Sequence, residues 1–257
     1  MFTNNELKIV VPGCRVVDAN VMPDGSCVLT LEQATAKDTT RHHQEGIFKL
    51  VPASKLSLND DFLKYSPKTP AEKAFMEAVK KVIKAGVQDF YRPTLDPSFD
   101  GDGRICYQAG MKPAVGKSYN WWYEHSKKYC SERKSRLGTK SEYIAFLAVF
   151  IKEMVASGKS LEWAWNAVCN DSKELGHYWN SNDAKHALEA TGNREVCGWR
   201  DLANNYKIMA EDKEAGGFWM AGGNYYGYSN DNPLAALRHN FDRNYAYYYG
   251  TGWLVLS

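Results

Sequence analysis

The sequence predicts an α+β fold in which two main helices pack on a small, mostly antiparallel sheet with extensive loops, plus a small β-rich N-terminal region. Three observations lead to this prediction. Short strand-like runs and turns fill the first sixty residues, two strong helix starts follow, and the last third is rich in Gly, Asn, Tyr and Trp. We expect residues 1–66 to form the β-rich region and residues 67–257 to form the main domain.

The N-terminal region contains four strand-like runs, at residues 7–11, 15–17, 27–31 and 46–51. Asp24 and Gly25 supply a turn between the second and third runs. Residues 37–45 are polar and should form an exposed loop. His42 and His43 lie in this loop, but neighbouring residues of an extended chain point in opposite directions and make a poor metal pair. We therefore expect no metal site there.

The first helix should span residues 69–85. Thr69 is a good N-cap, Pro70 suits the first turn, Glu72 completes a capping box and Gly86 offers a stop. A second capping box opens a helix over residues 140–157, whose apolar residues nearly encircle it. This pattern predicts a central, largely buried helix.

The chain after the second helix changes character. Ser160 caps a shorter third helix, and Trp163 and Trp165 on it are spaced for core packing. Beyond Asn170 the only helical periodicity is a short stretch at residues 202–210. Two further strands are expected, at 218–221 and 253–256, on either side of a long polar and aromatic segment.

Bulk properties exclude several classes of protein. A formal net charge of +2 does not favour nucleic-acid binding. The N-terminus lacks the pattern of a secretory signal, and no apolar run approaches the length of a membrane span. We therefore expect a soluble protein, cytoplasmic or phage-associated, and favour a monomer. The six cysteines, which include no C-x-x-C pair, are expected to be thiols rather than disulfides.

Two motifs suggest ligands but fail on their spacing. Residues 110–118 resemble a phosphate-binding loop, yet five residues separate the glycines where four are required, and Met111 stands where a glycine must curl around the phosphates. Residues 96–103 resemble a calcium loop, but Tyr107 occupies the place of the bidentate Glu. We expect a turn with Asx capping there instead. No catalytic constellation, metal site or cofactor is predicted.

Residues 224–250, NYYGYSNDNPLAALRHNFDRNYAYYYG, differ in composition from the rest of the chain. Tyr and Asn make up nearly half of the segment, whereas Lys, Glu, Gln, Met and Trp, about a fifth of the whole chain, are absent. By composition alone this absence has a probability on the order of one in several hundred. Met220 and Trp253 lie just outside the segment and look like core residues of the flanking strands.

Such a composition is typical of a binding surface, because Tyr gives a large contact area at low entropy cost and Asn supplies adaptable hydrogen bonds. Residues 233–237 should tuck inward as an anchor. The expected ligand-binding residues are Asn224, Tyr225, Tyr226, Tyr228, Asn230, Asp231, Asn232, Arg238, His239, Asn240, Asp242, Arg243, Asn244, Tyr245, Tyr247, Tyr248 and Tyr249. We expect the tyrosines to be exposed, with Arg238 and Arg243 as the charged hot spots and a protein as the partner. The alternatives are an ordinary polar loop, a low-complexity segment prone to disorder, and a structural loop with buried tyrosines.

Four stretches of the chain, at 140–147, 165–180, 215–223 and 252–256, resemble variable proteins of diversity-generating retroelements. These proteins have a C-type-lectin fold related to that of the formylglycine-generating enzymes. The resemblance covers roughly residues 86–257 and implies a hypervariable C-terminal region at about 220–257. In this family an error-prone reverse transcriptase randomises adenines, commonly in AAC codons, which cannot yield Lys, Glu, Gln, Met or Trp. These are the residue types missing from the segment.

The resemblance leaves two alternatives to a non-enzymatic binding protein. An enzyme of the formylglycine-generating type is disfavoured because no cysteine follows Cys197, whereas that chemistry resembles a copper site with paired cysteines near the C-terminus. A calcium-dependent lectin is suggested by residues 230–233, but they lie inside the diversified segment. A structural or interaction module of another kind also stays open.

Overall fold

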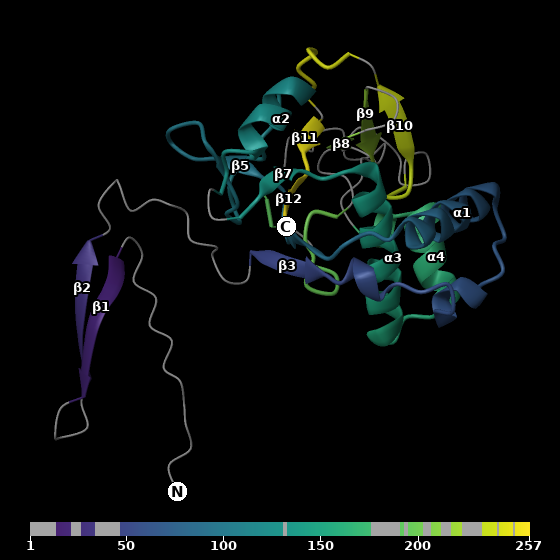
Figure 1. Cartoon of the computed structure of the whole chain (residues 1–257), viewed down its shortest axis with the longest axis horizontal. Helices are drawn as coiled ribbons and strands as arrows, with labels where there is room; N and C mark the ends of the chain where they lie inside the picture. Colours follow the sequence, from purple (N-terminus) through teal and green to yellow (C-terminus); the bar gives the residue numbers. More distant parts are fainter. Residues whose placement is uncertain are drawn as a thin grey trace, which may run out of the picture. The chain divides into compact units, whose positions relative to one another are not determined.

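The protein is described by a computed structural model, whose cartoon is shown in Figure 1. The structure describes residues 14–21, 27–33, 47–130, 133–175, 191–192, 195–202, 207–211, 217–222, 233–240, 242–248 and 250–257. It divides the chain into two compact units, Met1–His42 and His43–Ser257.

The described residues of the first unit form an antiparallel pair of strands, β1 (Cys14–Val21) and β2 (Cys27–Gln33). Its register pairs Val21 with Cys27 and is irregular between Val16 and Asp18. The strand-like runs at 15–17 and 27–31 are thus confirmed as strands. The runs at 7–11, the turn at 24–25 and the histidine-containing loop at 37–45 lie outside the described residues.

The boundary between these two compact units lies between His42 and His43, before β3. β3 (Phe48–Val51) pairs with β4 (Phe90–Pro93) of the main unit. The short 3-10 helices η1 (Ala53–Lys55) and η2 (Asp61–Lys64) follow. Phe62 in η2 is buried in the main core, where its carbonyl accepts a hydrogen bond from Trp165 Nε1 (3.2 Å). Burial of this apolar side chain joins the segment to the second unit.

Three helices begin at the N-cap residues that the sequence predicts. α1 (Pro70–Ala85) begins with the Thr69–Glu72 capping box, and Gly86 ends it at a φ of 74°. α3 (Lys140–Ala156) begins with the second capping box, and its side chains are buried on all faces from residue 142 to 151. α4 (Leu161–Cys169) is capped by Ser160. Trp165 on α4 is fully buried, whereas Trp163 is half-buried.

Two four-stranded sheets form most of the β part in the described residues of the main unit, which is therefore α+β as predicted. One has the order β3-β4-β12-β7, with β7 (Ser135–Leu137) and β12 (Leu254–Leu256), and is antiparallel throughout. The other has the order β10-β9-β8-β11 and contains β8 (Lys207–Glu211), β9 (Phe218–Ala221), β10 (Leu237–Asn240) and β11 (Gly250–Gly252). Only its β8–β11 pair is parallel among the described strands. The strands predicted at 218–221 and 253–256 are confirmed.

Two elements differ from the prediction. Residues 207–211 form β8 instead of ending a helical stretch, because β8 pairs with β9 on one side and β11 on the other. Ile208, Met209 and Ala210 are all buried, so they do not form the one-sided stripe of a surface helix. In addition, α2 (Tyr119–Ser126) was not predicted; Ser118 caps it by accepting a bond from Trp121 N–H.

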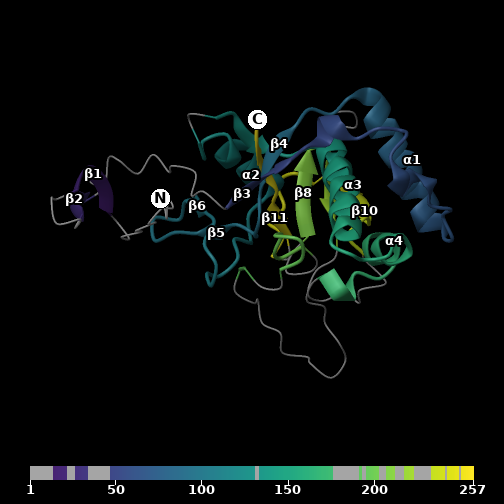
Figure 2. The same ribbon diagram turned by 90° about the horizontal axis from the view of Figure 1, so that it is seen from below.

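The helices lie on opposite sides of the β8–β11 pair, as Figure 2 shows: α1, α3 and α4 on one side and α2 on the other. Accordingly, the apolar residues form two clusters. The larger cluster surrounds α3, and the smaller one contains Trp122 of α2, Phe218 of β9 and Leu254 of β12. The short pair β5 (Ser98–Phe99) and β6 (Ile105–Cys106) and the 3-10 helix η3 (Lys173–Leu175) complete the described elements. None of the described helices is long and apolar enough to cross a membrane.

Candidate functional site

The expected binding residues fall into two groups in the structure. Eight lie outside the described residues: Asn224, Tyr225, Tyr226, Tyr228, Asn230, Asp231, Asn232 and Tyr249. The other nine lie on β10 or on the loop between β10 and β11: Arg238, His239, Asn240, Asp242, Arg243, Asn244, Tyr245, Tyr247 and Tyr248. The candidate site is therefore built here from the second group.

The start of this segment is anchored in the core, as predicted for residues 233–237. Leu234 is 1% exposed, its N–H donates to Ser172 Oγ (2.9 Å) and its carbonyl accepts from the Tyr143 hydroxyl (2.9 Å). Ala235 N–H donates to the Val168 carbonyl (3.0 Å) at the end of α4. These bonds satisfy buried backbone groups and fix the point from which β10 emerges.

The loop after β10 is shaped by its own polar side chains. Asp242 N–H donates to Asn240 Oδ1 (2.9 Å), and Asp242 Oδ1 accepts from the N–H groups of Asn244 (3.1 Å) and Tyr245 (3.2 Å). These are Asx-type turns, in which a side chain replaces a backbone acceptor. Asn240 and Asp242 therefore define the loop conformation through these oxygens.

The residues at the start of α2 hold the other side of this loop. Asn120 donates through its N–H to the Arg243 carbonyl (3.1 Å) and through Nδ2 to Asn244 Oδ1 (2.8 Å). Gly116 N–H donates to the Tyr247 carbonyl (3.1 Å). Within the phosphate-loop-like stretch 110–118, the Gly116 N–H is thus bonded to the protein's own chain.

The tyrosines of the loop do not all behave as expected. Tyr245 and Tyr248 are exposed, at 51% and 53%, in agreement with the prediction. Tyr247 is only 7% exposed: its ring packs edge-on against Phe218 (6.1 Å between centroids), and its hydroxyl accepts from Asn240 Nδ2 (2.5 Å). The prediction that Tyr247 is exposed was wrong. Its backbone forms an isolated β-bridge with Lys117, and its ring packs in the smaller core cluster.

The two arginines also differ. Arg238 on β10 is exposed, whereas Arg243 is half-buried. The Arg243 guanidinium lies 4.7 Å from the ring centroid of Tyr119 and donates to the Gly217 carbonyl (3.1 Å). Burial, as the largest cause, raises the pKa of Tyr119 to about 12. Arg243 thus serves the packing of α2 against β9, and Arg238 is the better placed of the two for a ligand.

We define the exposed tyrosine surface as Arg238, Asp242, Asn244, Tyr245 and Tyr248. Sequence reasoning missed a second aromatic group beside it, on and before α2. Trp121 stacks on His125 (3.9 Å, 10° between planes), and Lys117 Nζ lies 5.2 Å from the Trp121 ring centroid. Both rings are half-buried. The run Tyr-Asn-Trp-Trp-Tyr at 119–123 was the available signal for this group.

The other predicted motifs have structural roles. Asp100 Oδ1 accepts from the N–H groups of Asp102 (3.1 Å) and Arg104 (2.8 Å), which confirms the Asx turn expected there. Arg104 also pairs with both carboxylates. No group of three or more His, Cys, Asp or Glu is placed to hold a metal ion in the described part of the chain. Cys106, Cys130, Cys169 and Cys197 are free thiols, of which Cys130 and Cys169 are buried.

Comparisons with known proteins give distant similarities to solved structures. No protein-family model and no curated protein matches the sequence significantly. Among solved structures, the chain is similar to PvdO from Pseudomonas aeruginosa, with a TM-score of 0.43 and 11% identity over 66% of this chain and 81% of that one. It is also similar to CarF, with a TM-score of 0.42 and 10% identity over 66% of this chain and 87% of that one. Likeness at this level carries no argument about function.

Proposed function

We propose that this chain is a hypervariable ligand-binding protein without enzymatic activity, whose segment 224–250 is diversified by a retroelement and forms the binding surface. The observation that carries the proposal is the composition of that segment. It lacks the five residue types that adenine randomisation of AAC codons cannot produce, while Tyr and Asn dominate it. The proposal includes a C-type-lectin fold, and helices beside small, mostly antiparallel sheets with long connections are consistent with it.

The geometry of the described part supports a binding role. The exposed tyrosine surface projects from a loop that is fixed on both sides, by Leu234 in the core and by β11 in the sheet. A loop held in this way presents Tyr245 and Tyr248 with little loss of backbone entropy on binding. Exposed tyrosines and arginines are also among the residue types most often found as interface hot spots.

The proposed partner is a protein. Arg238, Asn244, Tyr245 and Tyr248 extend from a strand and a loop, and an exposed loop with long side chains suits a broad epitope better than a small molecule. Half-buried Arg243 and buried Tyr247 are instead assigned to the frame of the site, the packed residues that hold the loop in place without contacting the partner. The proposal requires no cofactor.

Sequencing the gene from several isolates tests the diversification. We expect substitutions concentrated in codons 224–250 at positions where the template has adenine, with codons 251–256 unchanged as the internal control. A reverse-transcriptase gene and a near-copy of the segment should lie nearby. Substitutions spread evenly along the gene, or Lys, Glu, Gln, Met and Trp appearing within the segment, would refute it.

A library experiment tests the binding surface itself. One library randomises Arg238, Asn244, Tyr245 and Tyr248, and a matched library randomises four exposed positions of α1, namely Lys73, Glu77, Lys81 and Lys84. Selection against a panel of immobilised proteins should enrich binders from the first library alone. Equal enrichment from both libraries would show that the exposed tyrosine surface has no special role.

A further inference from the structure

A pocket of about 530 Å³ is lined by residues of α1, α3, β9 and β10 and by the end of α4, the elements gathered on the right of Figure 2. We call it the Lys140 pocket. It shares no residue with the exposed tyrosine surface. Its volume lies within the range of small-molecule sites, so we asked which ligand its walls would suit.

The walls of the Lys140 pocket are mostly apolar. Ala71, Ala74 and Ala78 follow one another at helical spacing on α1, and their small side chains leave room beside that helix. Residues 233 and 235–237 line the pocket from the segment that leads into β10. Ala71 and Ala74 are exposed and Leu237 is half-buried, so a ligand can reach these walls from solvent. Such a lining favours a ligand with a hydrocarbon body.

Lys140 is the one charged residue among the described residues that line the pocket. It is half-buried, and its Nζ lies 3.8 Å from the ring centroid of Trp219, which also lines the pocket. The ring attracts the ammonium without neutralising its charge. Within the described part of the chain Lys140 has no carboxylate partner, and Glu142, two residues further along α3, pairs with Arg136 instead. The ammonium can therefore donate to an anionic ligand.

The other polar groups of the lining are already satisfied or neutral. Asn170 Nδ2 donates to Glu72 Oε1 (2.8 Å), and Asn170 Oδ1 accepts from Thr69 Oγ1 (2.8 Å). Burial raises the pKa of the Cys169 thiol, so this group is uncharged at neutral pH and does not repel an anion. The described lining thus combines one cation with an apolar surface.

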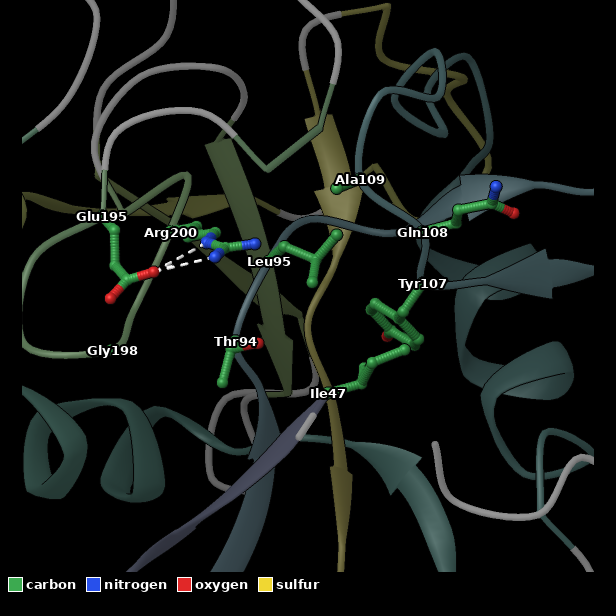
Figure 3. Close-up of a pocket in the computed structure, with 9 residues that line it drawn as sticks. All are labelled: Ile47, Thr94, Leu95, Tyr107, Gln108, Ala109, Glu195, Gly198 and Arg200. Atoms are coloured by element: carbon green, nitrogen blue, oxygen red, sulfur yellow. Dashed lines mark hydrogen bonds and ion pairs between the residues drawn. The ribbon is translucent and has the colours of Figure 1, made fainter. Parts of the chain in front are cut away.

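A smaller cavity, of about 270 Å³, differs from the Lys140 pocket in this respect, and Figure 3 shows the residues that line it. Its two charged side chains bind each other: Arg200 donates from Nε (3.0 Å) and Nη2 (2.8 Å) to Glu195 Oε2. A ligand there would have to displace an existing ion pair, whereas a ligand in the Lys140 pocket would not. We therefore assign the ligand to the larger pocket.

We infer that the Lys140 pocket binds a free medium-chain fatty acid. The carboxylate binds Lys140 Nζ, and the alkyl chain lies against Ala74 of α1 and Leu237 of β10. Burial of the chain and of these apolar walls drives binding, and the contact with Lys140 sets the direction of the ligand. This inference does not depend on the proposed display function, because it concerns a pocket outside the exposed tyrosine surface.

Isothermal titration calorimetry of the full chain with sodium decanoate tests the inference. We expect a dissociation constant between about 10 μM and 1 mM, as suits a ligand of this size. Octanoate, which is two methylenes shorter, should bind about five- to fifteen-fold more weakly, because each fully buried methylene corresponds to a factor of about four. Decylammonium, which has the opposite charge on a similar chain, should bind at least about ten-fold more weakly than decanoate. Absence of decanoate binding, or equal binding of decylammonium, would overturn the inference.

A charge variant tests the role of Lys140. Lys140→Gln should weaken decanoate binding about five- to ten-fold and should reduce the preference for decanoate over decylammonium. Lys81→Gln removes the same charge from an exposed position of α1 outside the pocket and should bind like the parent. Equal effects of the two variants would show that only the net charge of the protein matters and would refute the assignment to Lys140.

A pair of space-filling variants tests the location of the alkyl chain. Ala74→Phe places a ring at the pocket wall and should weaken decanoate binding at least about five-fold. Ala85→Phe makes the same change at the exposed end of α1, outside the pocket, and should leave binding unchanged. Because both alanines are exposed, we expect both variants to fold, and thermal melting checks this. Equal binding by folded Ala74→Phe and Ala85→Phe would contradict the placement of the chain.

Discussion

Replacing Tyr247 with alanine should destabilise the protein far more than the same change at its neighbours Tyr245 and Tyr248. All three tyrosines belong to the segment with the unusual composition, yet only Tyr247 is buried, at 7% exposure. This contrast separates the frame of the proposed binding site from the residues that are free to contact a partner.

The magnitude follows from what the Tyr247 side chain contacts. Removing a buried aromatic ring typically costs about 3–5 kcal/mol through lost burial and the remaining cavity. Tyr247 lies at the edge of the smaller core cluster, against Phe218, so we expect the lower end, about 3 kcal/mol. Tyr247→Phe keeps the ring and removes only the acceptor of the Asn240 bond, which should cost about 1 kcal/mol.

Urea unfolding followed by circular dichroism and tryptophan fluorescence measures these differences. Tyr245→Ala and Tyr248→Ala serve as matched controls and should each change the free energy of unfolding by no more than about 0.5 kcal/mol. A cost for Tyr245→Ala equal to that for Tyr247→Ala, or a Tyr247→Ala variant as stable as the parent, would refute this division.

Three further predictions concern the scaffold. Gly252→Ala should destabilise by about 1–3 kcal/mol in urea unfolding, because the added Cβ would lie 2.3 Å from Cε3 of fully buried Trp122. Burial raises the pKa of Glu142, but the Arg136 hydrogen bond and charge outweigh it and leave the pKa lowered. Glu142→Gln should therefore cost about 1.5–3 kcal/mol at pH 7, and the difference should shrink as pH falls from the ordinary value of 4.5 through the lowered pKa of Glu142 in the folded protein. Glu72→Gln, in the other capping box, is its control, and a difference for Glu142→Gln that does not shrink between pH 7 and pH 3 would contradict the linkage. Chelator and reductant should each shift the melting temperature by less than about 2 °C, and a larger drop would indicate a structural metal or disulfide.

The sequence predicts the elements whose signals are local. Thr69 and Thr139 each start a helix through a capping box that is complete within four residues, and both helices begin where expected. α2 and β8 were not predicted correctly because their conformation depends on distant partners. β8 becomes a strand between β9 and β11, and α2 is an aromatic-rich helix of eight residues with a weak apolar stripe.

The candidate site was predictable as a segment but not residue by residue. Composition identifies residues 224–250 as unusual, since it needs no knowledge of contacts. It cannot distinguish Tyr247 from Tyr245, because the inward direction of Tyr247 depends on its bridge to Lys117, far away in the sequence. Likewise, Arg243 becomes a packing residue only because Tyr119 and Gly217 lie beside it.

The turn built by Asn240 and Asp242 has a consequence for how such a site would change over generations. Their side-chain oxygens accept the bonds that set the path of the loop. A substitution at either position therefore alters the course of the backbone and moves Tyr245 along with it. If these codons are randomised, each round of variation samples new loop shapes as well as new side chains. The number of distinct surfaces is then the number of loop shapes multiplied by the number of side-chain combinations.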